Sequence, residues 1–201
     1  MAGRLEVPVL YDFASTLCYV AHRVMGNLEE ELERLDLDLV WRPLDLGSIT
    51  GWPRGVAMTN PARENTLRVA RELGVAVRMP AHWIDSREAN AIALALSGNA
   101  REPTWRERVF SAIHEEGRDL DEPGVLDSLA RDLSLDLEGL RGPEALAALE
   151  RETAQARLAQ ATGVPAFVLD GWPLTGIQLP DTMLDLFERW AEKKRPRSTS
   201  P

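Results

Sequence analysis

The sequence predicts an α/β fold in which a helical segment separates two regions that contain strands. A short apolar run at residues 7–13 is followed at once by apolar residues at helical spacing. Residues 51–142 read instead as helical patches separated by proline and glycine, and a strand run and a turn return after Pro143. The expected order is therefore strand, helix, strand, helical insertion, helix, hairpin and helix.

The first strand is expected at residues 7–13, VPVLYDF, because strand formers dominate and the proline stands near the start. From Leu17 to Leu35 apolar residues recur every three or four positions between glutamates and arginines, which predicts one amphipathic helix. Ser15 or Thr16 is its expected N-cap, because a hydroxyl there accepts from the free amides of the first turn. The alternating run at residues 37–44 predicts a second strand that closes at Pro43.

The region of residues 51–142 is expected to form an all-helical domain, with a short strand-like VAV run at residues 75–77. Gly74 and Gly117 are placed as C-caps of its helices. The expected helices of this domain occupy residues 61–73, 86–96, 104–116, 123–132 and 136–141.

After the insertion, a helix is expected from Pro143 to the stop signal Gly163, followed by a strand at residues 166–169. An Asp-Gly turn then leads into residues 173–175, which predicts an antiparallel hairpin. The last helix is expected to be capped by Leu179-Pro180-Asp181. The predicted division of the chain is a strand-containing domain at 1–50 and 143–192, a helical domain at 51–142, and a disordered basic tail at 193–201.

The charge and composition exclude several classes of partner. A net charge of −9, from 32 acidic and 23 basic side chains, repels phosphate backbones and anionic lipids, so neither nucleic acid nor a membrane is expected. The absence of a secretory apolar core and the single cysteine indicate a cytoplasmic protein without a disulfide. His22, His82 and His114 lack ligand spacing in the sequence, so no metal is expected, and all three are expected to be ordinary surface or partly buried histidines.

Two segments together resemble the DsbA family of thioredoxin-fold proteins: YDFASTLCY at residues 11–19 and ATGVPAF at residues 161–167. In that family a strand ends in Asp-Phe, a four-residue active motif opens the helix, and a Val-Pro with a cis peptide faces it. The resemblance extends to WRPLDL at 41–46 and GIQLPDTM at 176–183. It implies a thioredoxin fold with an all-helical domain inserted after the second strand.

The motif departs from the redox members of the family, because Ser15 occupies the position of the nucleophilic cysteine and only the second position is kept, as Cys18. Attack on a disulfide needs a thiolate, so dithiol exchange is excluded. A serine at this position is similar to the branch of kappa-class glutathione transferases and 2-hydroxychromene-2-carboxylate isomerases. That resemblance implies that glutathione is the cofactor and that Ser15 hydrogen-bonds its thiolate.

The same resemblance implies that Val164 and Pro165 pair with the extended backbone of glutathione. Thr16-Leu17 stands where that branch has Pro-Tyr, and the Gly-x-Gln-x-Pro turn is more similar to FrnE-like relatives. Gln178 and Asp181 are candidate glutathione contacts, with helix capping as the alternative role of Asp181.

A substrate pocket is expected where the insertion covers the active face. Trp52, Trp83 and Met58 are placed there as the lining of an apolar pocket for an aromatic or polycyclic substrate, and Trp41 with Arg42, at the end of the second strand, is a candidate contact for a carboxylate in the same pocket. Packing inside the insertion is the alternative explanation for these side chains. Cys18 lies beside the apolar stripe of its helix and is expected to be a small buried hydrophobe.

Three functional hypotheses follow. The leading one is a glutathione-dependent isomerase or transferase that acts on an apolar electrophile, with a thiolate as the nucleophile. The second is a non-catalytic, chaperone-like protein that binds extended peptides beside the cis-proline. The third is monothiol chemistry at Cys18. The sequence leaves a homodimer open.

Overall fold

The computed structural model describes residues 4–195 and is built on a four-stranded sheet with the order β2-β1-β3-β4. Strand β2 runs parallel to β1, whereas β3 is antiparallel to β1 and β4 is antiparallel to β3. The expected α/β class is confirmed. The strands are β1 (Leu5–Tyr11), β2 (Leu37–Pro43), β3 (Ala166–Leu169) and β4 (Trp172–Thr175).

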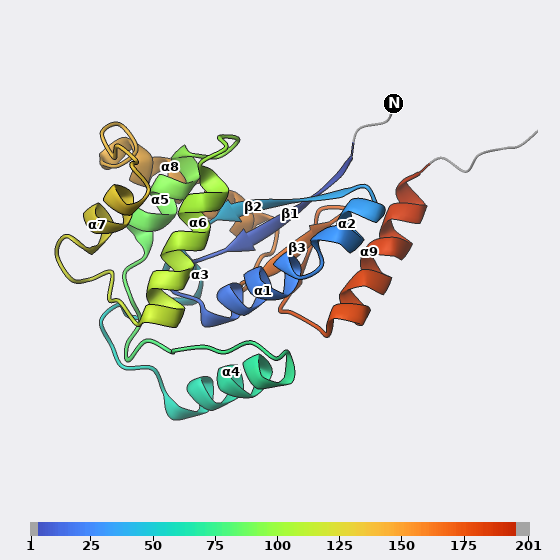
Figure 1. The fold of residues 1–201 in the computed structure, drawn as a ribbon, viewed down its shortest axis with the longest axis horizontal. Helices are drawn as coiled ribbons and strands as arrows, with labels where there is room; N and C mark the ends of the chain where they lie inside the picture. Colours follow the sequence, from blue (N-terminus) through green and yellow to red (C-terminus); the bar gives the residue numbers. More distant parts are fainter. Residues whose placement is uncertain (1–3, 196–201) are drawn as a thin grey trace, which may run out of the picture.

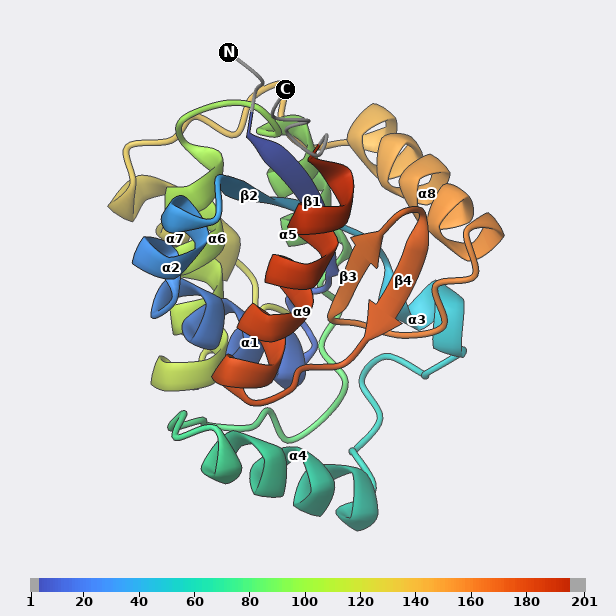
Figure 2. The ribbon, with the colours of Figure 1, turned by 90° about the vertical axis from the view of Figure 1, so that its right-hand side faces the viewer.

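Helices cover both faces of the sheet. Figure 2 shows α1, α2 and α9 on one side of the strands and α8 on the other. Figure 1 shows α5, α6 and α7 gathered at one end of the sheet, and in both views α4 lies beneath α1, which it contacts. The helices are α1 (Thr16–Gly26), α2 (Glu29–Arg34), α3 (Leu46–Thr50), α4 (Asn60–Glu72), α5 (Arg87–Ala95), α6 (Glu102–Ser111), the π-helical turn η1 (Ala112–Glu116), α7 (Val125–Asp132), α8 (Pro143–Leu158) and α9 (Pro180–Lys194).

Three local predictions are wrong. The expected single helix of residues 17–35 is two helices, because α1 ends at Gly26 and the Asn27 amide closes it on the carbonyls of Arg23 and Met25. Glycine and asparagine are both poor helix formers, so the break falls where propensity is lowest. Residues 75–77 pair with none of the strands in the described part of the chain, and residues 136–141 form loop and turns rather than a helix.

One apolar core joins the two predicted domains. It includes Phe167 of the sheet and Trp105 and Ile92 of the insertion, all fully buried. Helix α8 packs against α5, so the helical insertion at residues 51–142 is packed against the sheet-containing part of the chain. A shared core means that the insertion can hold side chains against the end of β1.

The C-terminal boundary also differs from the expectation. Helix α9 continues to Lys194 and so takes up the first two residues of the tail predicted at 193–201. Lys194 pairs there with Asp170 beside the β3–β4 turn. The rest of the predicted tail, residues 196–201, lies outside the described residues. Within residues 4–195, no helix is both long and apolar enough to cross a membrane.

Candidate functional site

The N-terminus of α1 presents two hydroxyl groups. Ser15 is the N-cap, and its Oγ accepts a hydrogen bond from the Cys18 amide at 3.3 Å. Thr16 follows at 4% exposure, and its Oγ1 is buried and has no hydrogen-bond partner among residues 4–195. Because the first amides of a helix also lack intrahelical acceptors, this end of α1 concentrates donors.

The Val164–Pro165 peptide bond is cis and lies at the same end of the sheet. Leu10 of β1 pairs with Ala166 of β3, so the antiparallel register places Pro165 beside the last residues of β1. The Pro165 carbonyl accepts from the Gly176 amide at 2.7 Å, which fixes the start of β3 against the segment after β4. The topology therefore brings Ser15 and the Val164–Pro165 bond to one edge of the fold.

Asp12, which sequence reasoning did not single out as a site residue, holds the loop before Ser15. Its buried carboxylate accepts from the Ala14 amide at 2.8 Å, from the Leu46 amide at 2.8 Å and from the Ser86 hydroxyl. Burial raises the pKa of this carboxyl, and these hydrogen bonds oppose the rise. The Asp-Phe pair at the strand end marks Asp12 in the sequence, but its partner Ser86 lies 74 positions away, so sequence pattern does not reveal this contact.

His114 holds the same loop from the other side. The imidazole is fully buried, and its Nε2 lies 2.9 Å from the Phe13 carbonyl oxygen. Burial lowers the pKa of His114 to about 4, so the ring is neutral at pH 7 and Nε2 carries the proton that it donates. The expectation of a surface or partly buried histidine is wrong, because η1 turns this residue inward against Tyr19, with ring centroids 5.2 Å apart.

Cys18 is fully buried one turn into α1. Burial raises the pKa of its thiol to about 12, and the hydrogen bond with Ser15 opposes that rise. The side chain therefore packs as a small neutral hydrophobe, as the sequence predicts.

Trp52 and Trp83 do meet beside the loop that leads to Ser15. Their rings stack with centroids 3.8 Å apart, and both line a cavity of about 20 Å³ together with Asp12, Ala14 and Arg54. A cavity of that size admits one water molecule, whereas ligand sites are typically about 300–1,000 Å³. Trp52 is 39% exposed, so a larger ligand requires this ring to swing outward. Met58, placed in the same wall, is buried.

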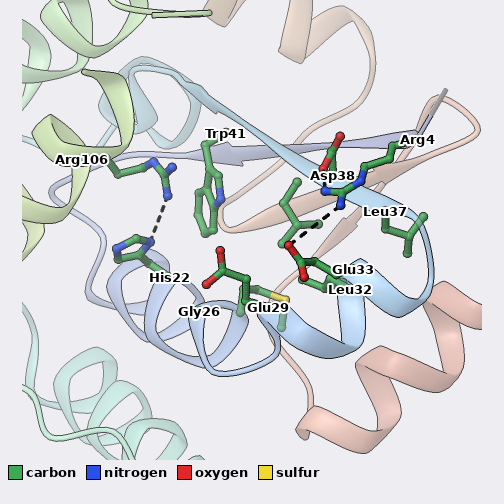
Figure 3. A pocket seen from close by; sticks show the side chains of 12 residues that line it. Arg4, His22, Gly26, Glu29, Leu32, Glu33, Leu37, Asp38, Trp41 and Arg106 are labelled. Atoms are coloured by element: carbon green, nitrogen blue, oxygen red, sulfur yellow. Dashed lines mark hydrogen bonds and ion pairs between the residues drawn. The ribbon is translucent and has the colours of Figure 1, made fainter. Parts of the chain in front are cut away.

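The structure does not bring Trp41 to this wall. Its ring lies under the Arg106 guanidinium at 4.7 Å and edge-on to His22 at 5.5 Å. Figure 3 shows these three side chains at one end of a cavity of about 250 Å³ between β2 and the α1–α2 corner. Side chains alternate along a strand, and the Trp41 position faces α1 and α6 rather than the loops that carry Trp52 and Trp83.

Gln178 and Asp181 lie on the segment that follows Gly176, and both are exposed. Asp181 stands in the first turn of α9, where a carboxylate is favoured by the helix dipole. The N-cap of α9 is Leu179, which makes no side-chain cap hydrogen bond. Capping through the Asp181 side chain is thus not present, and its carboxylate remains open to solvent.

Asp45 and Arg54 form an ion pair at the rim of the Trp52–Trp83 cavity. The Arg54 Nη2 lies 2.6 and 2.7 Å from the two oxygens of the Asp45 carboxylate. Asp45 also caps α3 through the Ser48 amide at 3.3 Å, and its own amide donates to the Thr153 hydroxyl at 2.9 Å. No spacing in the sequence points to this pair, because the loop between the two residues decides whether they meet.

One group of potential metal ligands is brought together among residues 4–195. His82, Asp119 and Asp121 each offer a ligand atom within 4.8 Å of the others. The expectation of no metal considered only sequence spacing, and the fold closes the 37 positions between His82 and Asp119.

Comparison with known proteins gives one family match and several structural likenesses. A family model described as the DSBA-like thioredoxin domain matches residues 6–188. No curated protein sequence matches the chain. A 2-hydroxychromene-2-carboxylate isomerase structure is 20% identical with a TM-score of 0.74, over 95% of this chain and 97% of that one.

Two further solved structures are similar over almost their whole length. A probable DsbA oxidoreductase from Streptomyces coelicolor is 19% identical with a TM-score of 0.74, over 98% of this chain and 94% of that one. The cytosolic disulfide reductase DsbM from Pseudomonas aeruginosa, solved with GSH, is 22% identical with a TM-score of 0.59, over 94% of this chain and 97% of that one. At these identities the likenesses show a common fold.

Proposed function

Because the chain belongs to the DSBA-like thioredoxin family, we propose that it is an enzyme that binds the thiol of glutathione at the N-terminus of α1. The reaction we propose is isomerisation or transfer on an apolar electrophile. The isomerase with the same fold and the DsbM structure solved with GSH make both parts of this proposal compatible with the family.

The observation that carries the proposal is the pair of hydroxyls at one helix end. The Ser15 Oγ accepts from the Cys18 amide, so its own hydrogen is a donor that a bound thiolate can take over from the neutral Cys18 sulfur. The Thr16 hydroxyl is buried without a partner, and a buried unpaired polar group is a cost that a ligand would remove. Both donors and the dipole of α1 favour a negatively charged sulfur, so they would lower the pKa of a thiol held there.

The chemistry divides between the thiol and the chain. When bound, the thiol supplies a nucleophilic sulfur that adds reversibly to an unsaturated carbonyl compound. Ser15 and Thr16 hold that sulfur as the anion, and the Val164 backbone beside the cis bond offers an extended peptide its polar groups. Stacked on Trp83, Trp52 covers the loop before Ser15 and leaves room there for about one water molecule.

The structure argues against chemistry at Cys18. With a pKa near 12, the thiolate fraction at pH 7 is on the order of 10⁻⁵, and the side chain is fully buried. The hypothesis of a monothiol enzyme therefore has little support. Dithiol exchange is excluded because position 15 is serine.

A non-catalytic peptide-binding protein is the second candidate. The specific observation in its favour is the cavity of about 20 Å³ at the tryptophan pair, which leaves no room for a polycyclic substrate unless Trp52 moves. This candidate predicts that an extended peptide binds beside Pro165 and that Ser15→Ala leaves its affinity unchanged.

Calorimetric titration with glutathione tests the proposal. The wild-type chain is expected to bind at millimolar ligand, and the ultraviolet absorbance of the thiolate should show a lowered pKa for the bound thiol. Ser15→Ala is expected to raise that pKa by about one to two units, because a hydrogen bond to a charged group is lost. The matched control is Ser97→Ala, on an exposed residue after α5. Absence of binding, or an equal thiol pKa in Ser15→Ala, would refute the proposal.

A further inference from the structure

Three side chains with metal-ligand chemistry converge near the base of α4, away from the α1 N-terminus. The Nε2 of His82 lies 3.1 Å from Asp121 Oδ2 and 3.3 Å from Asp119 Oδ2. All three side chains are partly exposed, at 26% for His82, 29% for Asp119 and 32% for Asp121. An ion can therefore reach the group from solvent.

Each carboxylate is oriented by a backbone amide. Asp121 Oδ1 accepts from the Asp85 amide at 2.9 Å, and Asp119 Oδ1 accepts from the Asp121 amide at 2.9 Å. In both residues this leaves Oδ2 turned toward His82. Such fixing of ligand side chains by outer hydrogen bonds is a regular feature of metal sites.

The separations fit a metal at the centre. Ligand atoms held about 2.0–2.2 Å from an ion at tetrahedral or octahedral angles lie roughly 2.8–3.6 Å apart. The two Nε2–Oδ2 distances, 3.1 and 3.3 Å, fall inside that range. The carboxylate oxygens of Asp119 and Asp121 lie within 4.8 Å of each other, so one ion can contact all three groups once these oxygens close to a similar separation.

We propose that His82, Asp119 and Asp121 form a binding site for a first-row divalent transition-metal ion, with Zn²⁺ as the best fit. One imidazole nitrogen and two carboxylate oxygens suit Zn²⁺, whereas Ca²⁺ and Mg²⁺ prefer oxygen ligands alone. The two carboxylates balance the charge of the ion. The ion would bind the lone pair of the neutral His82 imidazole at Nε2, and water would fill the remaining positions.

The proposed site lies beside the two chain segments that lead into and out of α4, residues 55–57 and residues 82–83. Residues 55–57 pair with His82 and Trp83 through the Gly55 amide to the Trp83 carbonyl at 2.8 Å and the Trp83 amide to the Val56 carbonyl at 3.0 Å. Figures 1 and 2 show α4 extending from these two segments, and within α4 only Ala70 is buried. A metal ion would tie this lightly packed arm to residues 118–122.

Titration of the full, tag-free chain with zinc chloride in the absence of glutathione tests the site separately from the thiol-binding proposal. The wild-type chain is expected to bind one Zn²⁺. Asp119→Asn keeps the turn through Oδ1 but loses one anionic ligand, and it should weaken binding at least about tenfold, as should His82→Gln. The matched control is Asp136→Asn, because Asp136 accepts from the Glu138 amide in the same kind of turn at 2.9 Å.

Hydrogen exchange gives a second readout. Stoichiometric Zn²⁺ should slow amide exchange at residues 82–85 and 118–121 in the wild-type chain and in Asp136→Asn, but not in Asp119→Asn. If no Zn²⁺ binds, or if Asp119→Asn and His82→Gln bind as tightly as the wild type, the three side chains form an ion pair only and the inference is overturned.

Discussion

Acidification from pH 7 to pH 5 is expected to destabilise the fold through His114, the residue that holds the loop before Ser15. Burial lowers its pKa from 6.5 to about 4 in the folded chain. The unfolded chain binds the proton more tightly, so the stabilising contribution is complete above the unfolded pKa of 6.5. It is lost as the pH falls through 6.5 toward 4.

The magnitude follows from linkage. Each pH unit below the unfolded pKa costs about 1.4 kcal/mol while the native imidazole stays neutral. At pH 5, roughly 1.5 units below that value, the cost from His114 alone is about 2 kcal/mol. This is a large share of the net stability of an ordinary domain, about 5–15 kcal/mol.

Urea unfolding followed by tryptophan fluorescence measures the effect, since the chain has 6 tryptophans. His114→Gln removes the titrating ring while its amide offers the Phe13 carbonyl a donor. Between pH 7 and pH 5 the wild type should lose about 2 kcal/mol more than this variant. Equal losses in the two proteins would refute the reasoning.

Two other groups with shifted pKa values, His22 and Asp12, act in both proteins alike. Burial, followed by the charge of Arg106, lowers the pKa of His22, so its contribution is also lost on acidification. Burial raises the pKa of Asp12, so its effect on stability has the opposite sign: protonation of this carboxyl at lower pH favours the folded chain. The difference between wild type and His114→Gln therefore isolates His114.

Three more outcomes are expected. Ser15→Cys places a thiol at the α1 N-terminus in a C-x-x-C motif, so this variant should reduce insulin disulfides. A Ser15→Cys, Cys18→Ala double variant should lack that activity, and failure of the single variant would mean that Cys18 is too deeply buried to take part. Native Cys18 should react with iodoacetamide far more slowly than in urea, and equal rates would contradict its burial. Asn90→Ala leaves the Phe13 amide and the Leu44 carbonyl without a side-chain partner, so it should lower the free energy of unfolding in urea by about 2–4 kcal/mol. The exposed control Asn65→Ala should change it little, and a loss below about 1 kcal/mol in Asn90→Ala would show that water replaces the amide.

Much of the fold was predictable from local pattern. The order of strands and helices, the Ser15 cap and the antiparallel hairpin follow from periodicity, caps and turn residues, which act over a few positions. The break after Gly26 was missed because the apolar spacing continues through Leu28 and Leu32, which are both buried in α2 and its cap. Hydrophobic period alone does not register a change of helix axis.

The features of the candidate site also separate into those set by local sequence and those set by tertiary packing. The sequence by itself excluded a thiolate nucleophile at position 15, because that residue is serine wherever the loop lies. Only the tertiary structure decided which distant groups surround it, such as Ser86 on Asp12 and His114 on the Phe13 carbonyl. It also decided that Trp41 turns away from Trp52, and that His82 meets two aspartates. These contacts depend on how helices pack around the sheet, and nothing in the sequence near each residue specifies that packing.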